Sequence, residues 1–319
     1  MRLTGDITAA EEFLAEWRDA SCGYVVAHTS GSTGDPKRIE LLKADMRASA
    51  EATCGFFGID AGSRLLLPLA MTYIAGKMMA VRADLADAEL IVELPSNDPL
   101  KCDYGCVDLM AVVPSQLPLL LANPLLDKVR NIIVGGAPVS PAMEAWLHGC
   151  QAHVYATYGM TETCSHVALR DVSRGDQLYR ALPGIAFDTD SRGCLVIEAQ
   201  RFSFGRLVTN DVVELHGHDA FRWLGRADNV VNSGGVKLHP EEIERKISAA
   251  IDVPYYMIGR PSERWGEELV LYVEDPEVDT VALGRRIEPL LDRYERPKTI
   301  LAVSRFERTA SGKVIRRVL

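Results

Sequence analysis

Residues 29–37 read Thr-Ser-Gly-Ser-Thr-Gly-Asp-Pro-Lys, a stretch with four hydroxyl side chains, two glycines and one terminal cation. Short apolar runs at 24–28 and 39–42 flank it and predict two strands joined by a loop. Hydroxyls and accessible backbone N–H groups beside a lysine suit phosphate binding, although Ser/Gly/Thr loops are more often plain surface connectors. Because Pro36 precedes Lys37 and a strand follows, the stretch is not a Walker A loop. A P-loop NTPase is therefore disfavoured.

The residues that follow this loop alternate between helical and extended patterns. Residues 43–57 have Ala, Met and Phe at helical spacing, and 115–122 and 141–148 are further helix-like segments. Between them lie short apolar runs bounded by Gly, Pro or polar residues, at 65–69, 111–113, 132–134 and 153–156. This alternation predicts an α/β fold with a largely parallel sheet and helices packed on it.

The last 145 residues have a different pattern. Residues 175–213 are rich in Gly and β-formers and predict a small antiparallel unit that caps the first domain. Pro240, Glu241 and Glu242 mark a helix start that continues through Ile251. A second helix is expected at 281–294, with strands at 255–258, 269–273 and 299–303. These elements predict an α+β domain of about 90 residues.

Composition narrows the class of protein. The 319 residues include 35 Lys+Arg and 44 Asp+Glu, a formal net charge of −9, and 47% are hydrophobic. This favours a soluble, cytoplasmic protein of two domains, and gives no general reason to expect nucleic acid or membrane as a partner. The longest apolar stretch, 65–76, is too short to cross a bilayer, and no secretory h-region follows Met1. Seven scattered cysteines do not suggest a disulfide framework or a zinc site.

Four motifs in a fixed order carry a family resemblance. They are the loop 29–37, Tyr-Gly-Met-Thr-Glu at 158–162, Gly-Arg-Ala-Asp at 225–228 with Asn-Ser-Gly-Gly at 232–235, and Ser-Gly-Lys at 311–313. Together they resemble the adenylate-forming (AMP-binding) superfamily of acyl- and aryl-CoA ligases, peptide-synthetase adenylation domains and luciferases. The resemblance implies a large αβ-layered N-terminal domain, 1–227, and a small mobile α+β domain, 228–319.

The resemblance also implies an ATP site. The phosphate loop would bind the β- and γ-phosphates through Lys37 and through Thr29, Ser30, Gly31, Ser32, Thr33 and Gly34. Tyr158 would stack on adenine beside Gly136, although a core tyrosine is an equally ordinary interpretation. Thr161 would contact the α-phosphate, and Glu162 would bind Mg²⁺, which prefers oxygen ligands.

Two further residues complete the implied nucleotide site, and a third marks the hinge between the domains. Asp211 resembles the acid that receives both ribose hydroxyls, since a carboxylate accepts two hydrogen bonds. Its neighbour Asn210 replaces the usual glycine, and we expect it to tolerate the same left-handed backbone. Arg226 matches the nucleotide-contacting arginine. Asp228 matches the hinge between the domains, which is compatible with its being a solvated linker acid.

Lys313 matches the catalytic lysine of the superfamily, whereas composition alone would make it part of a solvated basic tail. The implied reaction begins with attack of a carboxylate on the α-phosphorus of ATP, which expels pyrophosphate and forms an acyl-adenylate. The CoA thiolate then attacks the acyl carbon and expels AMP. Rotation of the small domain would withdraw Lys313 and bring Gly234 and Gly235 to the pantetheine tunnel. The usual proline upstream of the lysine is absent.

The acid is suggested by two segments, 159–170 and 112–116, which resemble the o-succinylbenzoate-CoA ligases of menaquinone biosynthesis. That substrate has two carboxylates, so its pocket needs a polar or cationic contact for the carboxylate that is not activated. We expect Ser165 and His166 to supply it, with Lys77 as a further candidate. A structural role for His166 is equally compatible with the sequence.

Only 28 residues precede Thr29, fewer than is usual in the superfamily. We expect part of the first subdomain to be missing, so that the acid pocket is more open or is completed by a second subunit in a homo-oligomer. Two alternative functions stay open: an enzyme that loads a carrier-protein thiol or activates another acid, and a nucleotide-binding regulatory protein without catalysis. The presence of Lys37, Glu162, Asp211, Arg226 and Lys313 argues against the last.

Overall fold

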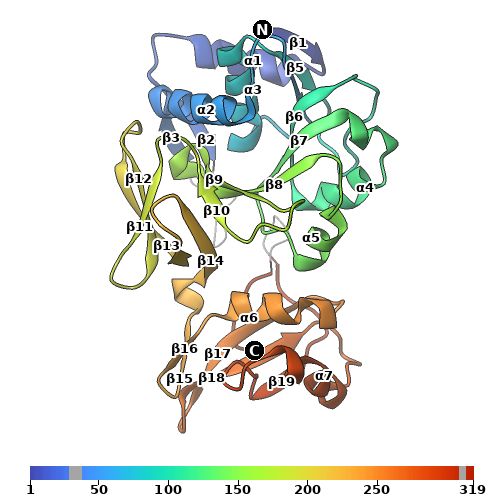
Figure 1. Cartoon of the computed structure of the whole chain (residues 1–319), viewed down its shortest axis with the longest axis vertical. Helices are drawn as coiled ribbons and strands as arrows, with labels where there is room; N and C mark the ends of the chain where they lie inside the picture. Colours follow the sequence, from blue (N-terminus) through green and yellow to red (C-terminus); the bar gives the residue numbers. More distant parts are fainter. Residues whose placement is uncertain (29–37, 309–313) are drawn as a thin grey trace.

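The computed structural model describes residues 1–28, 38–308 and 314–319. Two sheets organise it, one of twelve strands and one of five, together with a separate two-stranded hairpin. The two sheets lie at opposite ends of the long axis of the molecule (Figure 1). The large sheet uses strands between Arg2 and Arg226, and the small sheet uses strands between Val231 and Ala302.

The first half of the large sheet is parallel. Its strands, in spatial order, are β1 (Arg2–Gly5), β5 (Glu89–Val92), β4 (Arg64–Leu67), β6 (Val107–Val112), β7 (Val129–Val134) and β8 (His153–Met160). Neighbouring residues of one strand face opposite cores: Leu65 and Leu67 join one hydrophobic cluster, and Leu66 joins another. Burial on both faces is typical of a parallel sheet between two layers of helices.

Helices cover both faces of this parallel half, as the alternating sequence pattern predicts. One face is covered by α1 (Thr8–Arg18), α2 (Lys43–Phe57) and α3 (Ile74–Ala86). The other face is covered by α4 (Leu117–Leu121) and α5 (Pro141–Leu147), with the short 3-10 turns η1 (Pro114–Gln116) and η2 (Pro124–Lys128) nearby. The α/β layered fold is therefore confirmed.

The second half of the large sheet is antiparallel. After β8, its strands in spatial order are β9 (Ser165–Asp171), β10 (Tyr179–Ala181), β14 (Ala220–Arg226), β13 (Gly205–Leu215), β12 (Cys194–Ala199) and β11 (Ala186–Thr189). The 3-10 turn η3 (Thr161–Thr163) connects β8 to β9. The antiparallel strands expected from the sequence are present, but β10 hydrogen-bonds them into the large sheet, so they are not a separate cap.

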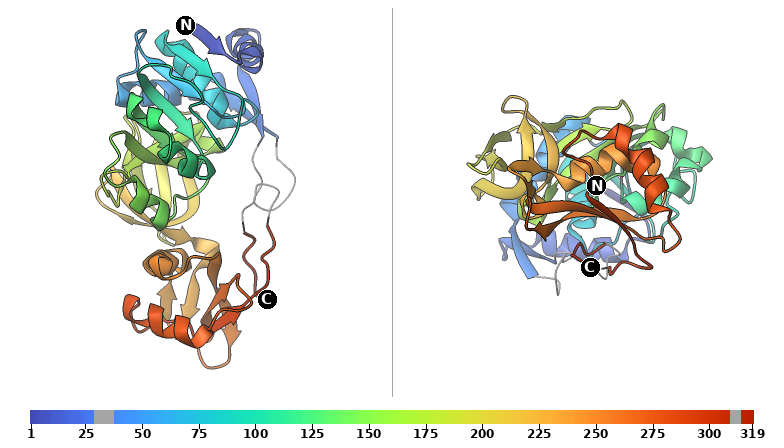
Figure 2. Two further views of the ribbon diagram at one scale, coloured as in Figure 1. Left: turned by 90° about the vertical axis from the view of Figure 1, so that its right-hand side faces the viewer. Right: turned by 90° about the horizontal axis from the view of Figure 1, so that it is seen from below.

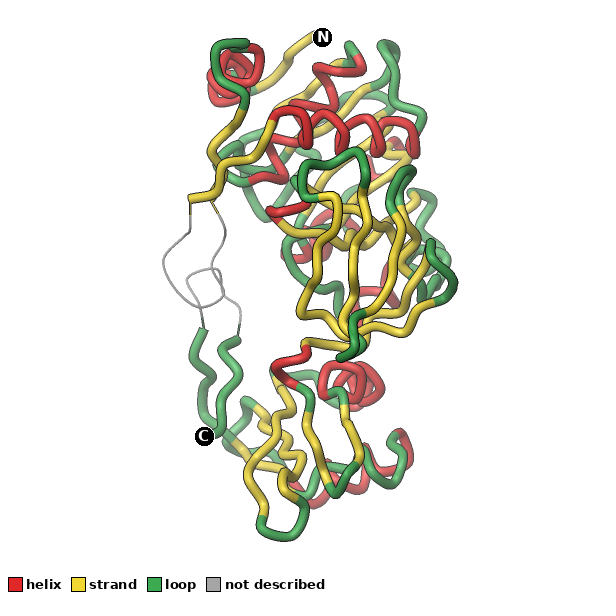
Figure 3. The backbone as a smooth tube through the Cα atoms, turned by 90° about the vertical axis from the view of Figure 1, so that its left-hand side faces the viewer, coloured by secondary structure: helices red, strands yellow, loops and turns green. Residues whose placement is uncertain are grey.

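The two strands expected around the phosphate loop form a hairpin, β2 (Tyr24–His28) and β3 (Arg38–Leu42). Their register pairs residue 24 with 42 and residue 28 with 38. The hairpin stands at one side of the large domain (Figure 3). The loop 29–37 itself lies outside the described residues.

The small sheet contains β15 (Val231–Ser233), β16 (Val236–Leu238), β17 (Tyr255–Ser262), β18 (Gly266–Val273) and β19 (Thr299–Ala302). It is packed with α6 (Pro240–Ile247) and α7 (Thr280–Ile287) and with the 3-10 turns η4 (Ala227–Asn229), η5 (Ser248–Ala250) and η6 (Glu288–Leu290). Figure 2 shows this unit below the large sheet. No helix in the described part of the chain is long and apolar enough to cross a membrane.

The two C-terminal helices are shorter than the sequence predicts. The helix expected through Ile251 ends at Ile247, and the one expected to reach residue 294 ends at Ile287. In both cases the chain tightens into a 3-10 turn, η5 or η6. Pro289 lies in η6 and has no N–H group to continue an α-helical hydrogen-bond ladder, which explains the second ending.

Candidate active site

Asp211 is the centre of a hydrogen-bonded cluster at the junction of β8, β13 and β14. Its carboxylate is buried, accepts a 2.8 Å hydrogen bond from Tyr158 Oη on Oδ2, and accepts a 3.1 Å bond from Trp223 Nε1 on Oδ1. The guanidinium of Arg226, its register partner on β14, lies 3.6 Å from Oδ1. Two hydrogen-bond donors and one ion pair thus hold the carboxylate in place.

The ring of Tyr158 is fixed by other aromatic side chains. Phe221 meets it edge-on at 5.0 Å between ring centroids, and Tyr179 lies at 5.8 Å. The guanidinium of Arg170 lies 5.3 Å from the centroid of the Tyr179 ring. Burial, and then the negative Asp211, raise the pKa of Tyr158, so its hydroxyl remains a donor at neutral pH.

The glycine expected beside Tyr158 lies at the carboxyl end of the parallel strands. Gly136 is exposed, has a φ of +82°, and follows β7, which pairs with β8. A side chain at Gly135 would begin 2.8 Å from Thr157 Oγ1, so the backbone passes close to β8 here. Ligands of open α/β sheets bind at this edge, where the strands end.

Thr161 and Glu162 occupy the turn η3, directly after β8. The side chain of Glu162 is exposed and that of Thr161 is half-buried. Within 1–28, 38–308 and 314–319, no three His, Cys, Asp or Glu side chains form a metal cluster. If Mg²⁺ binds here as the family resemblance implies, Glu162 would be one protein ligand, and phosphate oxygens and waters would be the others, which is the usual coordination of this ion. A bound Mg²⁺ would supply positive charge against the phosphates.

The proposed hinge residue Asp228 lies in η4 and is exposed. Its carboxylate accepts a hydrogen bond from Asn210 Nδ2 and lies 3.8 Å from the Arg226 guanidinium. Asn210 has no positive φ, so this position does not need the left-handed backbone that Gly and Asn both tolerate. The amide instead connects β13 to the segment between the two sheets.

Lys37 and Lys313, like Thr29, Ser30, Gly31, Ser32, Thr33 and Gly34, lie outside the described residues. The chain on both sides of 309–313 is described. Arg308 and Val314 form an antiparallel bridge, and the Arg316 guanidinium makes two 2.7 Å hydrogen bonds to Glu244 of α6. The segment after residue 313 is therefore fastened to α6.

Ser165 and His166 begin β9, just after the turn η3 that contains Glu162. His166 lies opposite Gly159, where an added Cβ would collide with the carbonyl oxygen of Ser165. His166 is 5% exposed, and its Nε2 lies 3.1 Å from Thr53 Oγ1. Burial, and then the nearby charge of Arg82, hold its pKa well below the usual value, so the imidazole is neutral.

Arg82 of α3, which was not singled out from the sequence, lies beside Ser165. Its side chain is 1% exposed, and Nη2 donates a 3.0 Å hydrogen bond to Ser165 Oγ. Its Nε has no partner, and no carboxylate in the described part of the chain forms an ion pair with it. Burial lowers its pKa to about 10, which leaves the guanidinium charged at neutral pH. The only signal in the sequence was an arginine inside the apolar run 78–83.

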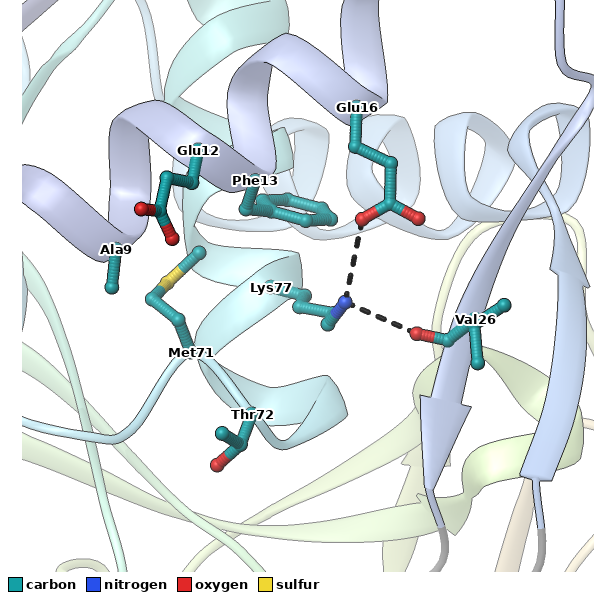
Figure 4. A pocket seen from close by; sticks show the side chains of 8 residues that line it. All are labelled: Ala9, Glu12, Phe13, Glu16, Val26, Met71, Thr72 and Lys77. Atoms are coloured by element: carbon teal, nitrogen blue, oxygen red, sulfur yellow. Dashed lines mark hydrogen bonds and ion pairs between the residues drawn. The ribbon is translucent and has the colours of Figure 1, made fainter.

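Lys77 lies in a different place from Ser165 and His166. It borders a pocket of about 420 Å³, whose walls include Phe13, Glu16 and Val26 (Figure 4). Lys77 Nζ donates a 3.1 Å hydrogen bond to the Val26 carbonyl, lies 3.8 Å from Glu16, and stands 4.8 Å from the centre of the Phe13 ring. Neither Ser165 nor His166 lines this pocket.

Gly234 and Gly235 form the turn between β15 and β16, and both have positive φ. The turn packs against Trp265, since a Cβ on Gly234 would lie 2.9 Å from its ring, and Gly234 N donates to the Trp265 carbonyl at 2.8 Å. Arg264 and Lys298 place their cations 4.7 and 5.6 Å from the indole centroid. An exposed aromatic surface with two cations thus lies beside this turn.

A family model described as AMP-binding enzyme matches residues 6–188, more than half of the chain. The protein therefore belongs to the AMP-binding enzyme family. Among curated relatives, indoleacetate–CoA ligase of Aromatoleum aromaticum is 26% identical over 91% of this chain and 65% of its own length. The 2-succinylbenzoate–CoA ligase of Listeria monocytogenes is 28% identical over 97% of this chain and 72% of its own. The chain thus spans about two thirds of these relatives' length.

Solved structures show the same fold. An acyl-CoA synthetase (AMP-forming)/AMP-acid ligase II-like protein from Dyadobacter fermentans is 38% identical, with a TM-score of 0.66, over 96% of this chain and 91% of that one. The o-succinylbenzoate CoA synthetase of Bacillus subtilis, in complex with ATP and magnesium, is 21% identical with a TM-score of 0.75, over 91% of this chain and 68% of that one. The adenylate-forming fold expected from the four motifs is confirmed.

Proposed function

We propose that the protein is an AMP-forming acid–CoA ligase that activates o-succinylbenzoate with ATP and transfers it to CoA. The observation that carries the choice of acid is Arg82, a fully buried guanidinium without a carboxylate partner among the described residues. An uncompensated buried charge is costly, and an anionic ligand group would compensate it. A dicarboxylic acid brings one carboxylate to be activated and a second for such a cation.

In this proposal ATP binds at the edge where β7 and β8 end. Tyr158 presents its ring to adenine beside Gly136, Asp211 accepts the ribose hydroxyls, and Arg226 contacts the nucleotide. Asp211 suits this role because its oxygens are already oriented by Tyr158 and Trp223. Glu162 holds Mg²⁺, which offsets the charge of the phosphates.

The residues assigned to the reacting groups are Thr161, Lys37 and Lys313. Thr161 contacts the α-phosphate, and the two lysines offset the negative charge that builds up as the acid's carboxylate oxygen bonds to the α-phosphorus and pyrophosphate leaves. We further propose that the chain divides at Asp228, and that the unit 228–319 rotates before the CoA thiolate attacks the acyl carbon and AMP leaves.

The acceptor in this proposal is free CoA, with a carrier-protein thiol as the alternative. CoA differs from a carrier-bound pantetheine by its phosphorylated adenosine, which is both aromatic and anionic. Trp265, Arg264 and Lys298 offer the matching surface beside Gly234 and Gly235. A Trp265→Ala variant should raise KM for CoA several-fold and leave KM for free pantetheine unchanged. An equal rise for both would favour the carrier protein.

The deciding experiment is turnover with ATP, CoA and a panel of acids. We expect pyrophosphate release and thioester formation with o-succinylbenzoate at a kcat/KM at least tenfold above that with benzoate, indoleacetate or a fatty acid. Higher kcat/KM with a monocarboxylate would reject o-succinylbenzoate as the substrate. Absence of pyrophosphate release with every acid would reject the ligase activity itself.

A further inference from the structure

Five polar groups from α2, α3 and β9 form one continuous chain of hydrogen bonds. Thr53 Oγ1 lies 3.1 Å from the Ser49 carbonyl oxygen and 3.1 Å from His166 Nε2. His166 Nδ1 lies 3.3 Å from Ser165 Oγ, which in turn accepts a 3.0 Å bond from Arg82 Nη2. The chain therefore runs from a helix carbonyl to the unpartnered guanidinium.

The direction of the hydrogens along this chain is restricted by its two ends. The Ser49 carbonyl can only accept, and the guanidinium can only donate. If Thr53 donates to Ser49, then His166 donates through Nε2–H to Thr53, and Ser165 donates its hydroxyl hydrogen to His166 Nδ1. Every hydrogen in this order has an acceptor. In the reverse order, with Nδ1–H on the histidine, the Ser165 hydroxyl hydrogen has none among the described residues.

We propose that His166 is a positioning residue: as a neutral Nε2–H imidazole it accepts the Ser165 hydroxyl hydrogen, so that the Ser165 oxygen accepts from Arg82 and holds the guanidinium for the second carboxylate of the acid. The identity of the acid rests on the proposed function, whereas the order of the hydrogens does not. Ser165 and His166 then act on the acid through Arg82 and do not touch it.

The surroundings of the histidine agree with this role. His166 is buried beside a permanent cation, and both burial and like charge disfavour an imidazolium there. The ring cannot therefore offer a second positive charge to an anionic acid. Because the Ser165 hydroxyl donates its hydrogen to His166 Nδ1, Arg82 is the group that donates hydrogen bonds to the acid.

Two substitutions separate the two ring nitrogens. In His166→Asn the amide oxygen replaces Nδ1 as the acceptor for Ser165, and in His166→Gln the amide nitrogen replaces Nε2 as the donor to Thr53. We expect KM for o-succinylbenzoate to rise about fivefold in His166→Gln and clearly less in His166→Asn, because the bond to Ser165, which holds Arg82, is lost only in His166→Gln, whereas His166→Asn loses the bond to Thr53. KM for ATP should stay unchanged in both. The opposite ranking would overturn the proposal.

A double-mutant cycle decides whether the histidine acts through the arginine. In an Arg82→Met background, the His166→Gln substitution should have no further effect on KM for o-succinylbenzoate, because the group being positioned is absent. A full fivefold effect in that background would mean that His166 touches the acid directly, against the proposal. His216→Gln, an exposed histidine paired with Glu214, provides the matched control.

The tautomer can be measured without any substrate. Long-range proton–nitrogen NMR correlations should show that the His166 ring is neutral and carries its proton on Nε2. The His166 signals can be identified because they disappear in the His166→Gln variant. A proton on Nδ1, or an imidazolium at neutral pH, would overturn the proposal. If the wild-type enzyme does not prefer o-succinylbenzoate, the proposed acid is rejected, while the NMR measurement still decides the order of hydrogens.

Discussion

The two halves of the candidate site differ in how complete they are without ligand. On the nucleotide side, the charge of Asp211 is matched by Tyr158, Trp223 and Arg226. On the acid side, Arg82 has one serine oxygen and no carboxylate among the described residues. The proposed nucleotide side is thus preorganised, whereas Arg82 on the proposed acid side lacks an anion to match its buried charge. Substitutions should therefore affect selectivity for the acid more than they affect ATP binding.

The largest effect is expected for Arg82→Met. Its kcat/KM for o-succinylbenzoate should fall about 10- to 100-fold, as expected when a buried charged hydrogen-bond donor is lost, and kcat/KM for benzoate should change little. The Tm should stay equal or rise, because an apolar side chain replaces an unpaired buried charge. Steady-state kinetics and thermal unfolding check both points.

Arg174→Met, an exposed arginine on the same domain, is the control for Arg82→Met. If both variants keep the wild-type acid preference, the acid side has no special need for an anion. The comparison between the two halves would then be wrong.

A smaller effect is expected for Asp211→Asn on the nucleotide side. The amide keeps the shape but loses the charge and one acceptor oxygen, so KM for ATP should rise about tenfold. KM for the acid should stay unchanged. Asp188→Asn, an exposed acid on β11, is the matched control. A rise in the KM for acid as large as that for ATP would show that the two halves are not separate.

Trp223→Phe should have a still smaller effect. It removes one of the two hydrogen-bond donors to Asp211 and keeps most of the aromatic volume, so KM for ATP should rise about three- to fivefold. The exposed Trp146, changed to Phe, should leave KM unchanged. Wild-type KM in Trp223→Phe would show that Tyr158 and Arg226 alone orient the carboxylate.

The smallest effect concerns stability and pH. The pKa of His166 is depressed in the folded protein, so the unfolded chain binds more protons below about pH 6.5. The free energy of unfolding should therefore fall as pH drops below that value, by at most about 1.4 kcal/mol per pH unit for this one group. Denaturant unfolding from pH 7.5 to 5 should give a flatter profile for His166→Gln than for His216→Gln. Parallel profiles would contradict the depressed pKa.

Much of the fold follows from local sequence. The helix expected at 43–57 has those bounds in the structure, because Gly58 ends it in a left-handed conformation with a φ of +65°. The layered sheet follows from the short apolar runs. The C-terminal helices were overestimated where Pro289 and the turn after Ile247 interrupt apolar spacing.

The candidate site was harder to predict from sequence. Arg82 is buried because α2 and β9 pack on α3, contacts between residues far apart in the chain that no local pattern reports. Lys77 was chosen for its charge, but it lies five residues from Arg82, about 140° around the same helix, and so faces another pocket. Trp223 was missed because its indole N–H reaches Asp211 only through the pairing of β13 with β14, which the sequence does not show.

The pair between Arg316 and Glu244 has a practical consequence for following the enzyme in solution. Because the last residues are bound to α6 by two hydrogen bonds, the proposed rotation would carry the segment after Lys313 and this helix together. In the present arrangement Arg222 of β14 also pairs with Glu242 of α6 at 2.7 Å. Spectroscopic labels on α6 and on the large sheet would thus report, turnover by turnover, where the C-terminal segment is, without any label on the lysine itself.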